Sequence, residues 1–319
     1  MVMNCMCTLF HCDAKIVAHR ILSKYLFSSY KNQHLFVSKQ CNFPVHTNYM
    51  KQSTRLLLTA LLFLIFHFSF LVFSSFGQSA SKKWKLVWSD EFNYKGLPDP
   101  SRWNYDVGGH GWGNNELQYY REKQLTNSRV ENGLLIIEAR KENYQDKQYT
   151  SARLVTKGKG DWQYGKIEVR AKIPSGLGTW PAIWMLGSTT PLKWPDDGEI
   201  DVMEHVGWNP TYLHASIHCK KYNHSIGTQR TDTVIVKNVM EKFHVYGVEW
   251  DTDKVQVCID GIIYFTFKND HSDYNAWPFD NKMHLLLNVA VGGNWGGAKG
   301  VDETIWPRRM EVDYVRVWQ

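Results

Sequence analysis

Three acidic residues stand close together between Glu199 and Glu204. Side chains of a β-strand alternate between two faces, so Glu199 and Asp201 share one face, and the aliphatic residues that follow them share the other. Strict alternation would place Glu204 on the aliphatic face, where an unpaired carboxylate is costly. A β-bulge at Val202-Met203 adds one residue and returns Glu204 to the face of the other acids. The run predicts a bulged strand with three carboxylates on one surface.

Three acids in one row repel each other and push their pKa values apart, so that one is ionised and another protonated near neutral pH. Glycoside hydrolysis with retention needs such a pair, a carboxylate nucleophile and a carboxylic acid roughly 5–5.5 Å apart. Glu199 and Glu204 suit those roles, and Asp201 between them could hold a proton or a hydrogen bond to the nucleophile. On the strand alone, a solvated acidic face and a calcium site stay open as alternatives.

The elements that must position this row read as short strands. Residues 165–174 alternate between apolar and charged side chains, which is typical of a half-buried strand. Other apolar or β-branched runs bounded by turn-forming residues also predict strands: 134–140, 283–291 and 310–318. Between residues 255 and 267, two such runs flank Asp260-Gly261. This pair predicts a hairpin with a type I′ turn, because both central residues of that turn need positive φ.

After residue 80, the sequence shows no apolar stripe at helical spacing long enough for a core helix. The expected fold class is all-β, with a sandwich of two antiparallel sheets favoured over a closed barrel. Residues 81–319 hold all 14 Trp, and their length suits one domain of this kind. Loops rich in Gly and Trp, 108–115 and 292–297, are where binding groups are expected.

Charge and cysteine content also divide the chain near residue 80. The first 80 residues hold seven Lys or Arg and one acid, which leaves 30 bases and 30 acids in the rest. The folded part is therefore close to neutral, and no nucleic-acid partner is expected. Four of the six cysteines lie in the first 49 residues, which leaves Cys219 and Cys258. Two cysteines are too few for a disulfide scaffold, and their spacing does not decide whether they pair.

The leader reads as an export signal over residues 50–80. Basic residues after Met50 precede a long apolar run, and small residues follow that run. The apolar run approaches the ~18–20 residues of a membrane span, so a retained anchor is the alternative to cleavage. Residues 1–49 show no targeting pattern, and we interpret them as a non-native upstream extension. The expected location is secreted or periplasmic.

The run from Glu199 to Glu204 resembles the catalytic signature of glycoside hydrolase family 16, in its laminarinase-like form with an extra residue before the second Glu. Further blocks are similar to the same family and follow its order: 88–92, 114–119, 178–184, 292–297 and 310–318. The resemblance covers about residues 84–319. It implies a β-jelly-roll with a cleft across a concave sheet. It also implies retaining hydrolysis of internal β-1,3-glucan bonds, with Glu199, Asp201 and Glu204 as nucleophile, assisting acid and acid/base.

Aromatic and polar residues near the row are candidates for substrate binding. Trp180 and Trp184 lie in a block that the resemblance places in the cleft, and sugar rings pack their flat C–H faces on indole. Trp295 in a Gly-rich loop is expected to form a wall of that cleft. Three polar residues match positions that line such clefts, although a lone strand histidine is more often structural: Asn115, Arg153 and His218.

The resemblance also implies a structural calcium on the convex side, at Glu91, Gly133 and Asp313. Calcium takes several oxygen ligands, including backbone carbonyls that a sequence does not display. No cofactor is expected for catalysis. His214 and His218 are four residues apart in a predicted strand, a spacing that carries no zinc signal.

The expected partner is therefore a β-1,3-glucan, and the protein is expected to be a monomer. Another polysaccharide is the first alternative, since enzymes acting on mixed-linkage glucan, agar or carrageenan share the carboxylate strand. The 292–297 block and the bulged signature favour β-1,3-glucan. A non-catalytic glucan-binding module is the second alternative, and it is disfavoured because all three acids are present.

Overall fold

The structure is a computed structural model that describes residues 83–319. The predictions for residues 1–49 and 50–80 lie outside that range. Within it, no helix is long and apolar enough to cross a membrane. The first half of the described chain forms these strands: β1 Leu86–Asp90, β2 Asn104–Tyr105, β3 Gln118–Tyr120, β4 Ser128–Glu131, β5 Leu134–Tyr144, β6 Lys147–Ser151, β7 Arg153–Val155, β8 Asp161–Trp162, β9 Gly165–Lys172 and β10 Thr179–Gly187.

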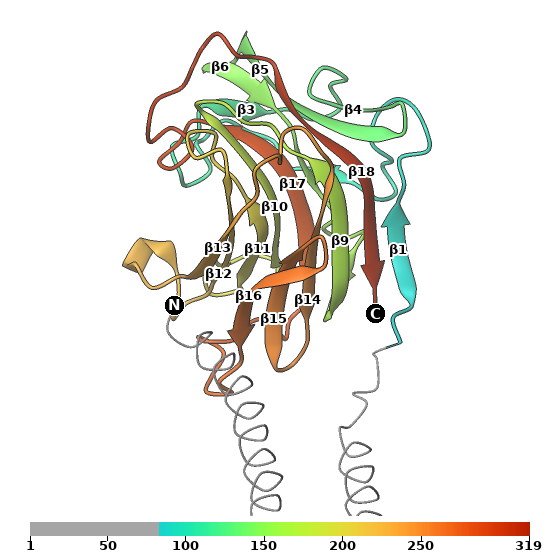
Figure 1. Ribbon diagram of the computed structural model, residues 1–319, viewed down its shortest axis with the longest axis vertical. Helices are drawn as coiled ribbons and strands as arrows, with labels where there is room; N and C mark the ends of the chain where they lie inside the picture. Colours follow the sequence, from blue (N-terminus) through green and yellow to red (C-terminus); the bar gives the residue numbers. More distant parts are fainter. Residues whose placement is uncertain (1–82) are drawn as a thin grey trace, which may run out of the picture. The chain divides into compact units, whose positions relative to one another are not determined.

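The second half contributes the strand with the acidic row and the remaining elements: β11 Glu199–Glu204, β12 Tyr212–His218, the short 3₁₀ helix η1 His224–Ile226, β13 Arg230–Ile235, β14 His244–Trp250, β15 Lys254–Ile259, β16 Ile262–Lys268, β17 Met283–Val291 and β18 Arg308–Trp318. The strands are curved along their lengths and lie in two layers (Figure 1).

The strands form two sheets. The first follows the order β16-β15-β14-β9-β18-β5-β6-β3, with β1 on β18 and β4 on β5. The second follows the order β13-β12-β11-β10-β17-β7-β2, with β8 on β17. Neighbouring strands are antiparallel except β3 and β6, which pair in parallel. The prediction of an all-β sandwich is confirmed, with this one parallel pair as the departure from it.

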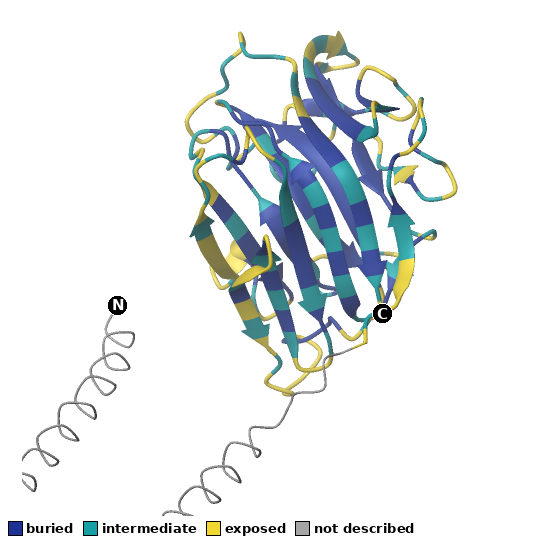
Figure 2. Ribbon diagram, turned by 45° about the vertical axis from the view of Figure 1, so that its right-hand side comes forward, coloured by how far each residue is buried: buried dark blue, intermediate teal, exposed yellow. Residues whose placement is uncertain are grey.

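One hydrophobic core joins the two sheets. Val169 of β9 and Val315 of β18 belong to the same buried cluster as Ile183 of β10 and Ile200 of β11. Along β9 every second residue is buried, and Figure 2 shows the alternation of buried and partly exposed residues along the strands of the first sheet. The apolar residues of each strand thus fill the space between the sheets, and the residues between them face outward.

The predicted strands are found, with changes at their ends. Residues 283–291 form β17 as expected, in the interior of the second sheet between β10 and β7, and all nine residues are buried. Residues 310–318 form most of β18, and 134–140 form the first part of a longer β5. The hairpin at Asp260-Gly261 joins β15 to β16, and both turn residues have positive φ, 50° and 79°. Cys219 and Cys258 are free thiols.

Candidate active site

The acidic row lies on β11, between β10 and β12 of the second sheet. Two neighbouring residues of β10 face Asp201 and Met203, so Val202 between them has no partner on that strand. The register against β12 also shifts between Asp201 and Glu204. The predicted β-bulge at Val202-Met203 is confirmed. The phenol of Tyr264, on β16 of the other sheet, donates a hydrogen bond of 3.3 Å to the carbonyl of Val202 and supports the bulge from below.

The bulge separates apolar from acidic side chains. Val202 and Met203 are both part of the core between the sheets. Asp201 is 2% exposed and lies beneath the surface, whereas Glu199 and Glu204 are partly exposed. One additional residue in the strand thus turns Glu204 away from the core, to the side of the other two acids.

His218 completes the centre of the row from β12, where it lies opposite Glu199. Its Nε2 atom is 3.3 Å from Oδ2 of Asp201 and 3.8 Å from Oε1 of Glu199. The imidazole therefore lies between the two carboxylates. The structure shows His218 next to the acids, and its contact with substrate stays a prediction.

Each glutamate of the row receives a hydrogen bond from an indole. Trp194 donates to Oε2 of Glu199 at 2.8 Å, and Trp180 donates to Oε1 of Glu204 at 3.0 Å. Trp194 belongs to the loop before β11, and Trp180 lies on β10. Because an indole has a single N–H donor, it binds only one of the two carboxylate oxygens of each glutamate.

The acids shift one another's proton affinity. Burial, with repulsion from Asp201 as the second cause, raises the pKa of Glu199 to about 8. Burial raises the pKa of Asp201 to about 7. Burial, followed by repulsion from Asp201 and Glu199, raises the pKa of Glu204 well above its usual range. A proton is therefore retained within the row at neutral pH, as acid catalysis by a carboxyl group requires.

Trp180 and Trp295 form an aromatic wall beside Glu204. Their rings meet edge to face at 5.5 Å, and Trp295 meets the ring of His214 in the same manner at 4.8 Å. His214 lies opposite Glu204 on β12. The indole of Trp208 donates a hydrogen bond of 2.7 Å to the carbonyl of Trp295, which anchors the Gly-rich loop.

Arg153 and Trp184 lie next to each other beside the row. The guanidinium of Arg153 stacks on Trp184 at 4.5 Å and on Trp112 at 4.6 Å, and it pairs with Asp106 at 2.9 Å. The indole of Trp184 donates a hydrogen bond of 2.7 Å to Asn288. Arg153 is thus largely buried between two indoles, and its charge is already paired.

Asn115 lies in the loop between β2 and β3. It has positive φ, 54°, and its side chain donates a hydrogen bond of 2.8 Å to Asn294 in the Gly-rich loop. The carbonyl of Asn114 also accepts a bond from the backbone of Asn294. The two predicted binding loops therefore meet. The structure shows no contact of Asn115 with the acidic row within the described residues.

Sequence reasoning missed two groups at the site. Trp194 contacts Glu199, and its ring packs on His224 with 5.0 Å between centroids. Asn288 of β17 connects the indole of Trp184 to the phenol of Tyr120. Trp194 could have been found from its position five residues before Glu199. The hydrogen bond between Trp184 and Asn288 joins residues more than 100 positions apart, so no local sequence pattern predicts it.

The three residues expected to hold calcium line one pocket of about 640 Å³ on the first sheet. Both carboxylate oxygens of Glu91 accept bonds from Arg316, at 2.9 and 2.8 Å. Oδ2 of Asp313 accepts a bond from Arg170 at 2.5 Å. Gly133 lies in a hairpin turn with φ of 77°, and Asp313 lies at a bulge of β18. Oδ1 of Asp313 and backbone carbonyls are therefore the oxygens left to meet a cation.

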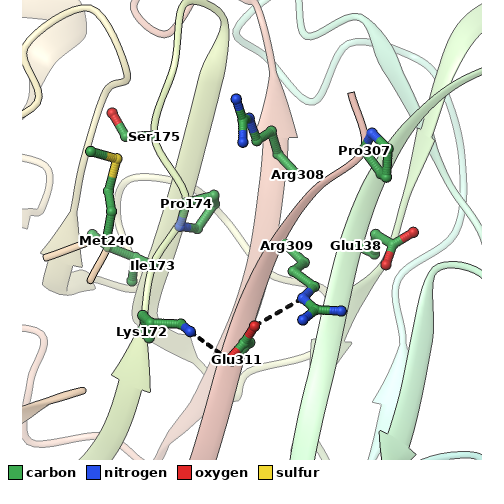
Figure 3. Close-up of a pocket in the computed structure, with 10 residues that line it drawn as sticks. All are labelled: Glu138, Lys172, Ile173, Pro174, Ser175, Met240, Pro307, Arg308, Arg309 and Glu311. Atoms are coloured by element: carbon green, nitrogen blue, oxygen red, sulfur yellow. Dashed lines mark hydrogen bonds and ion pairs between the residues drawn. The ribbon is translucent and has the colours of Figure 1, made fainter. Parts of the chain in front are cut away.

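Another cavity of about 350 Å³ lies between the ends of β9 and β18 (Figure 3). Its two acids are both held by cations. Glu311 pairs with Lys172 and Arg309, each at 2.9 Å, and Glu138 pairs with Arg129 at 3.1 Å. No carboxylate of this cavity is thus placed to act as a nucleophile or an acid.

Comparison with known proteins agrees with this geometry. The model of glycosyl hydrolases family 16 matches residues 113–316. A β-glucanase of Rhodothermus marinus is 52% identical over 257 residues, which cover 77% of this chain and 90% of the relative.

Solved structures show the same relationship. A laminarinase from Rhodothermus marinus has a TM-score of 0.73 and 53% identity, and the match covers 74% of this chain and 97% of that one. SCLam, a non-specific endo-β-1,3(4)-glucanase solved with an oligosaccharide at its active site, has a TM-score of 0.73 and 48% identity over 75% and 95% of the two chains. The described fold, the bulged acidic strand and these matches together show that the chain belongs to glycoside hydrolase family 16.

Proposed function

We propose that the protein is an endo-acting β-glucan hydrolase that cleaves β-1,3-glucosidic bonds with retention of configuration. The observation that carries this proposal is the row of three carboxylates on β11, with Asp201 buried at its centre and a partly exposed glutamate at each end that accepts a hydrogen bond from an indole. The laminarinase and β-glucanase relatives support β-1,3-glucan as the substrate.

In the proposed mechanism, the reactive form of the row is the one in which Glu199 has lost its proton and Glu204 has kept its own. The carboxylate of Glu199 attacks the anomeric carbon and forms a glycosyl-enzyme. Glu204 gives its proton to the leaving oxygen and then removes a proton from the water that hydrolyses the intermediate. The raised pKa of Glu204 suits the first of these steps. Asp201 assists by holding a proton next to Glu199, and the imidazole of His218 lies beside both acids.

Aromatic and polar groups around the row are proposed to hold the glucan. Trp180 and Trp295 form a wall next to the acid/base, and Trp184 offers a further indole face. Each stack of a sugar ring on indole contributes about 0.5–1.5 kcal/mol by analogy with other aromatic contacts. Arg153 supports the Trp184 ring from behind, and Asn115 joins the two loops at the edge of the site.

Mixed-linkage glucan is the second candidate substrate, because SCLam is a non-specific endo-β-1,3(4)-glucanase and shares the fold at 48% identity. A non-catalytic glucan-binding role is disfavoured, since the three acids lie together with raised pKa values. A structural site keeps carboxylates ionised by pairing them with cations. Among residues 83–319, the ion-pair contacts of this row come from a single histidine, which lies between two of its acids.

One assay separates these functions. Purified protein is incubated with laminarin, lichenan, agarose and carrageenan, and new reducing ends are measured. Rapid release of reducing ends from laminarin is the expected result, and chromatography of the early products should show oligosaccharides of several lengths. Release of reducing ends from lichenan alone would show that the substrate is mixed-linkage glucan. Binding to laminarin without any release of reducing ends would establish the non-catalytic role.

We also propose that the protein is exported as a monomer and carries a structural Ca²⁺ in the pocket of Glu91, Gly133 and Asp313. The basic start of residues 50–80 and the apolar run after it support export. A carboxylate oxygen of Asp313 and backbone carbonyls of a hairpin turn and a bulge are the hard oxygen donors that calcium prefers. Its role there would be to tie β18 to the β4–β5 turn.

A further inference from the structure

We propose that Glu199, Asp201 and His218 form a binding site for a transition-metal dication, and that Zn²⁺ bound there blocks the active site. Glu199 and Asp201 lie on β11, and His218 lies opposite Glu199 on β12. One ligand atom of each residue lies within 4.8 Å of the other two. Metal binding does not depend on the proposed function, whereas the blocking of activity rests on it.

The spacing of the ligand atoms fits a tetrahedral metal site. Zn²⁺ binds nitrogen and oxygen at about 2.0–2.2 Å, so neighbouring ligand atoms of a tetrahedral site lie about 3.3–3.6 Å apart. Nε2 of His218 is 3.3 Å from Oδ2 of Asp201 and 3.8 Å from Oε1 of Glu199. The first distance already fits, and the partly exposed Glu199 has the freedom to close the second.

An unpartnered oxygen points independently to a ligand. Asp201 is 2% exposed, and its Oδ2 atom has no hydrogen-bond partner among the described residues. Nε2 of His218 is near it, but the two atoms do not meet in hydrogen-bond geometry. A buried carboxylate oxygen without a donor is costly. A dication bound between Oδ2 of Asp201 and Nε2 of His218 supplies the missing partner of Oδ2.

The surroundings indicate which metal binds and how tightly. Trp194 holds Oε2 of Glu199, which leaves Oε1 on the side of His218. One imidazole with two carboxylates suits Zn²⁺ or Cu²⁺, whereas Ca²⁺ and Mg²⁺ prefer oxygen alone. Nδ1 of His218 has no acceptor in the described part of the chain. A histidine that binds metal through one ring nitrogen usually donates a hydrogen bond from the other, and loss of that bond lowers metal affinity about 10–100-fold. The site should therefore bind Zn²⁺ reversibly and not hold it as a resident metal.

Direct binding tests the site without any substrate. The untagged full chain is titrated with ZnCl₂ by calorimetry in excess Ca²⁺, which occupies oxygen-only sites, and with Co²⁺ while its visible absorption is recorded. One site and a tetrahedral Co²⁺ spectrum are expected. His218→Ala and Asp201→Asn should each lower the affinity at least about tenfold. His214→Ala removes a histidine on the same strand, opposite Glu204, and should leave the affinity unchanged. Equal Zn²⁺ affinity in the His218→Ala and wild-type proteins would overturn the proposal.

Steady-state kinetics tests whether bound Zn²⁺ blocks hydrolysis. Zn²⁺ should raise KM for laminarin without lowering kcat, because the ion and the sugar occupy the same carboxylates, and a chelator should restore the original KM. Inhibition that lowers kcat alone would place the ion elsewhere and contradict the blocking role. A metal-free protein that binds Zn²⁺ as expected but hydrolyses no glucan would refute the proposed function and leave the metal site intact.

Discussion

The indole of Trp180 donates a hydrogen bond of 3.0 Å to Oε1 of Glu204, and this bond lowers a pKa that burial raises. The two residues lie 24 positions apart and meet because β10 and β11 are neighbours in the second sheet. The bond leaves Glu204 protonated at neutral pH but limits how firmly it keeps its proton. Trp180 is therefore expected to set the proton affinity of the acid/base as well as to form the aromatic wall.

Trp180→Phe should shift the pH dependence of hydrolysis. The substitution keeps an aromatic ring but removes the donor, so the pKa of Glu204 rises further. A general acid works only while it is protonated, and the loss of kcat/KM at high pH should therefore move to higher pH. Trp184→Phe is the matched control, because that indole bonds to Asn288 and not to an acid of the row. An equal shift in both variants would argue against a specific role of the Trp180 bond.

Substitution of the two glutamates should produce different products with azide. Glu204→Ala forms the glycosyl-enzyme from an activated substrate but lacks the base, and azide then attacks without a base to give a β-glycosyl azide. Glu199→Ala lacks the nucleophile, so azide attacks the substrate directly and gives the α-azide. NMR of the products decides. The opposite pairing of variants and anomers would reverse the roles of Glu199 and Glu204.

Glu199→Gln should stabilise the protein at alkaline pH. Burial raises the pKa of Glu199 from 4.5 to about 8, so folding favours its protonated form. That contribution to stability is complete below the unfolded-state pKa, and it is lost as the pH rises through the folded-state pKa. At about pH 4, the variant and the wild-type protein should have the same Tm. At about pH 9, the Tm of the variant should be higher, by about 2–4 °C for each kcal/mol by which the substitution raises the free energy of unfolding. Thermal unfolding at both pH values checks this, and a lower Tm of the variant at the higher pH would contradict it.

Removal of calcium should lower the Tm of the wild-type protein, and added Ca²⁺ should restore it, because an ion that binds only the folded state stabilises that state. Asp313→Ala should abolish this response. Glu91→Gln removes the carboxylate charge that pairs with Arg316, but the backbone carbonyl of residue 91 remains. The Tm of this variant should therefore still rise with Ca²⁺. A wild-type Tm that does not change with chelator would remove the proposed ion.

Export should leave a defined N-terminus. If residues 50–80 are a cleaved signal, N-terminal sequencing of the secreted protein should begin between Gln78 and Lys83. Residues 1–49 should be absent from it. Finding them on the mature protein would contradict both the start at Met50 and the cleavage. Recovery of the intact apolar run in a membrane fraction would support the retained anchor.

Local sequence patterns predicted much of the fold. The alternation of residues 165–174 specifies which face of β9 is buried, and Asp260-Gly261 specifies a hairpin, because both signals act between near neighbours in the chain. The full length of β5 and the parallel pairing of β3 with β6 were not predicted. Strand ends and partners depend on contacts made elsewhere in the sheet, which no local period contains.

The sequence alone determined the acidic row and its bulge. Strict alternation of side chains would place Glu204 on the core face, opposite Glu199 and Asp201. One additional residue in the strand corrects this, so the spacing of the acids required the bulge at Val202. Only the tertiary structure decided what surrounds the row. Strand register brought His218 beside Asp201, and the path of the loop before β11 brought Trp194 onto Glu199. These contacts set the charge and proton affinity of the site, and they arise because folding joins residues whose separation along the chain carries no signal.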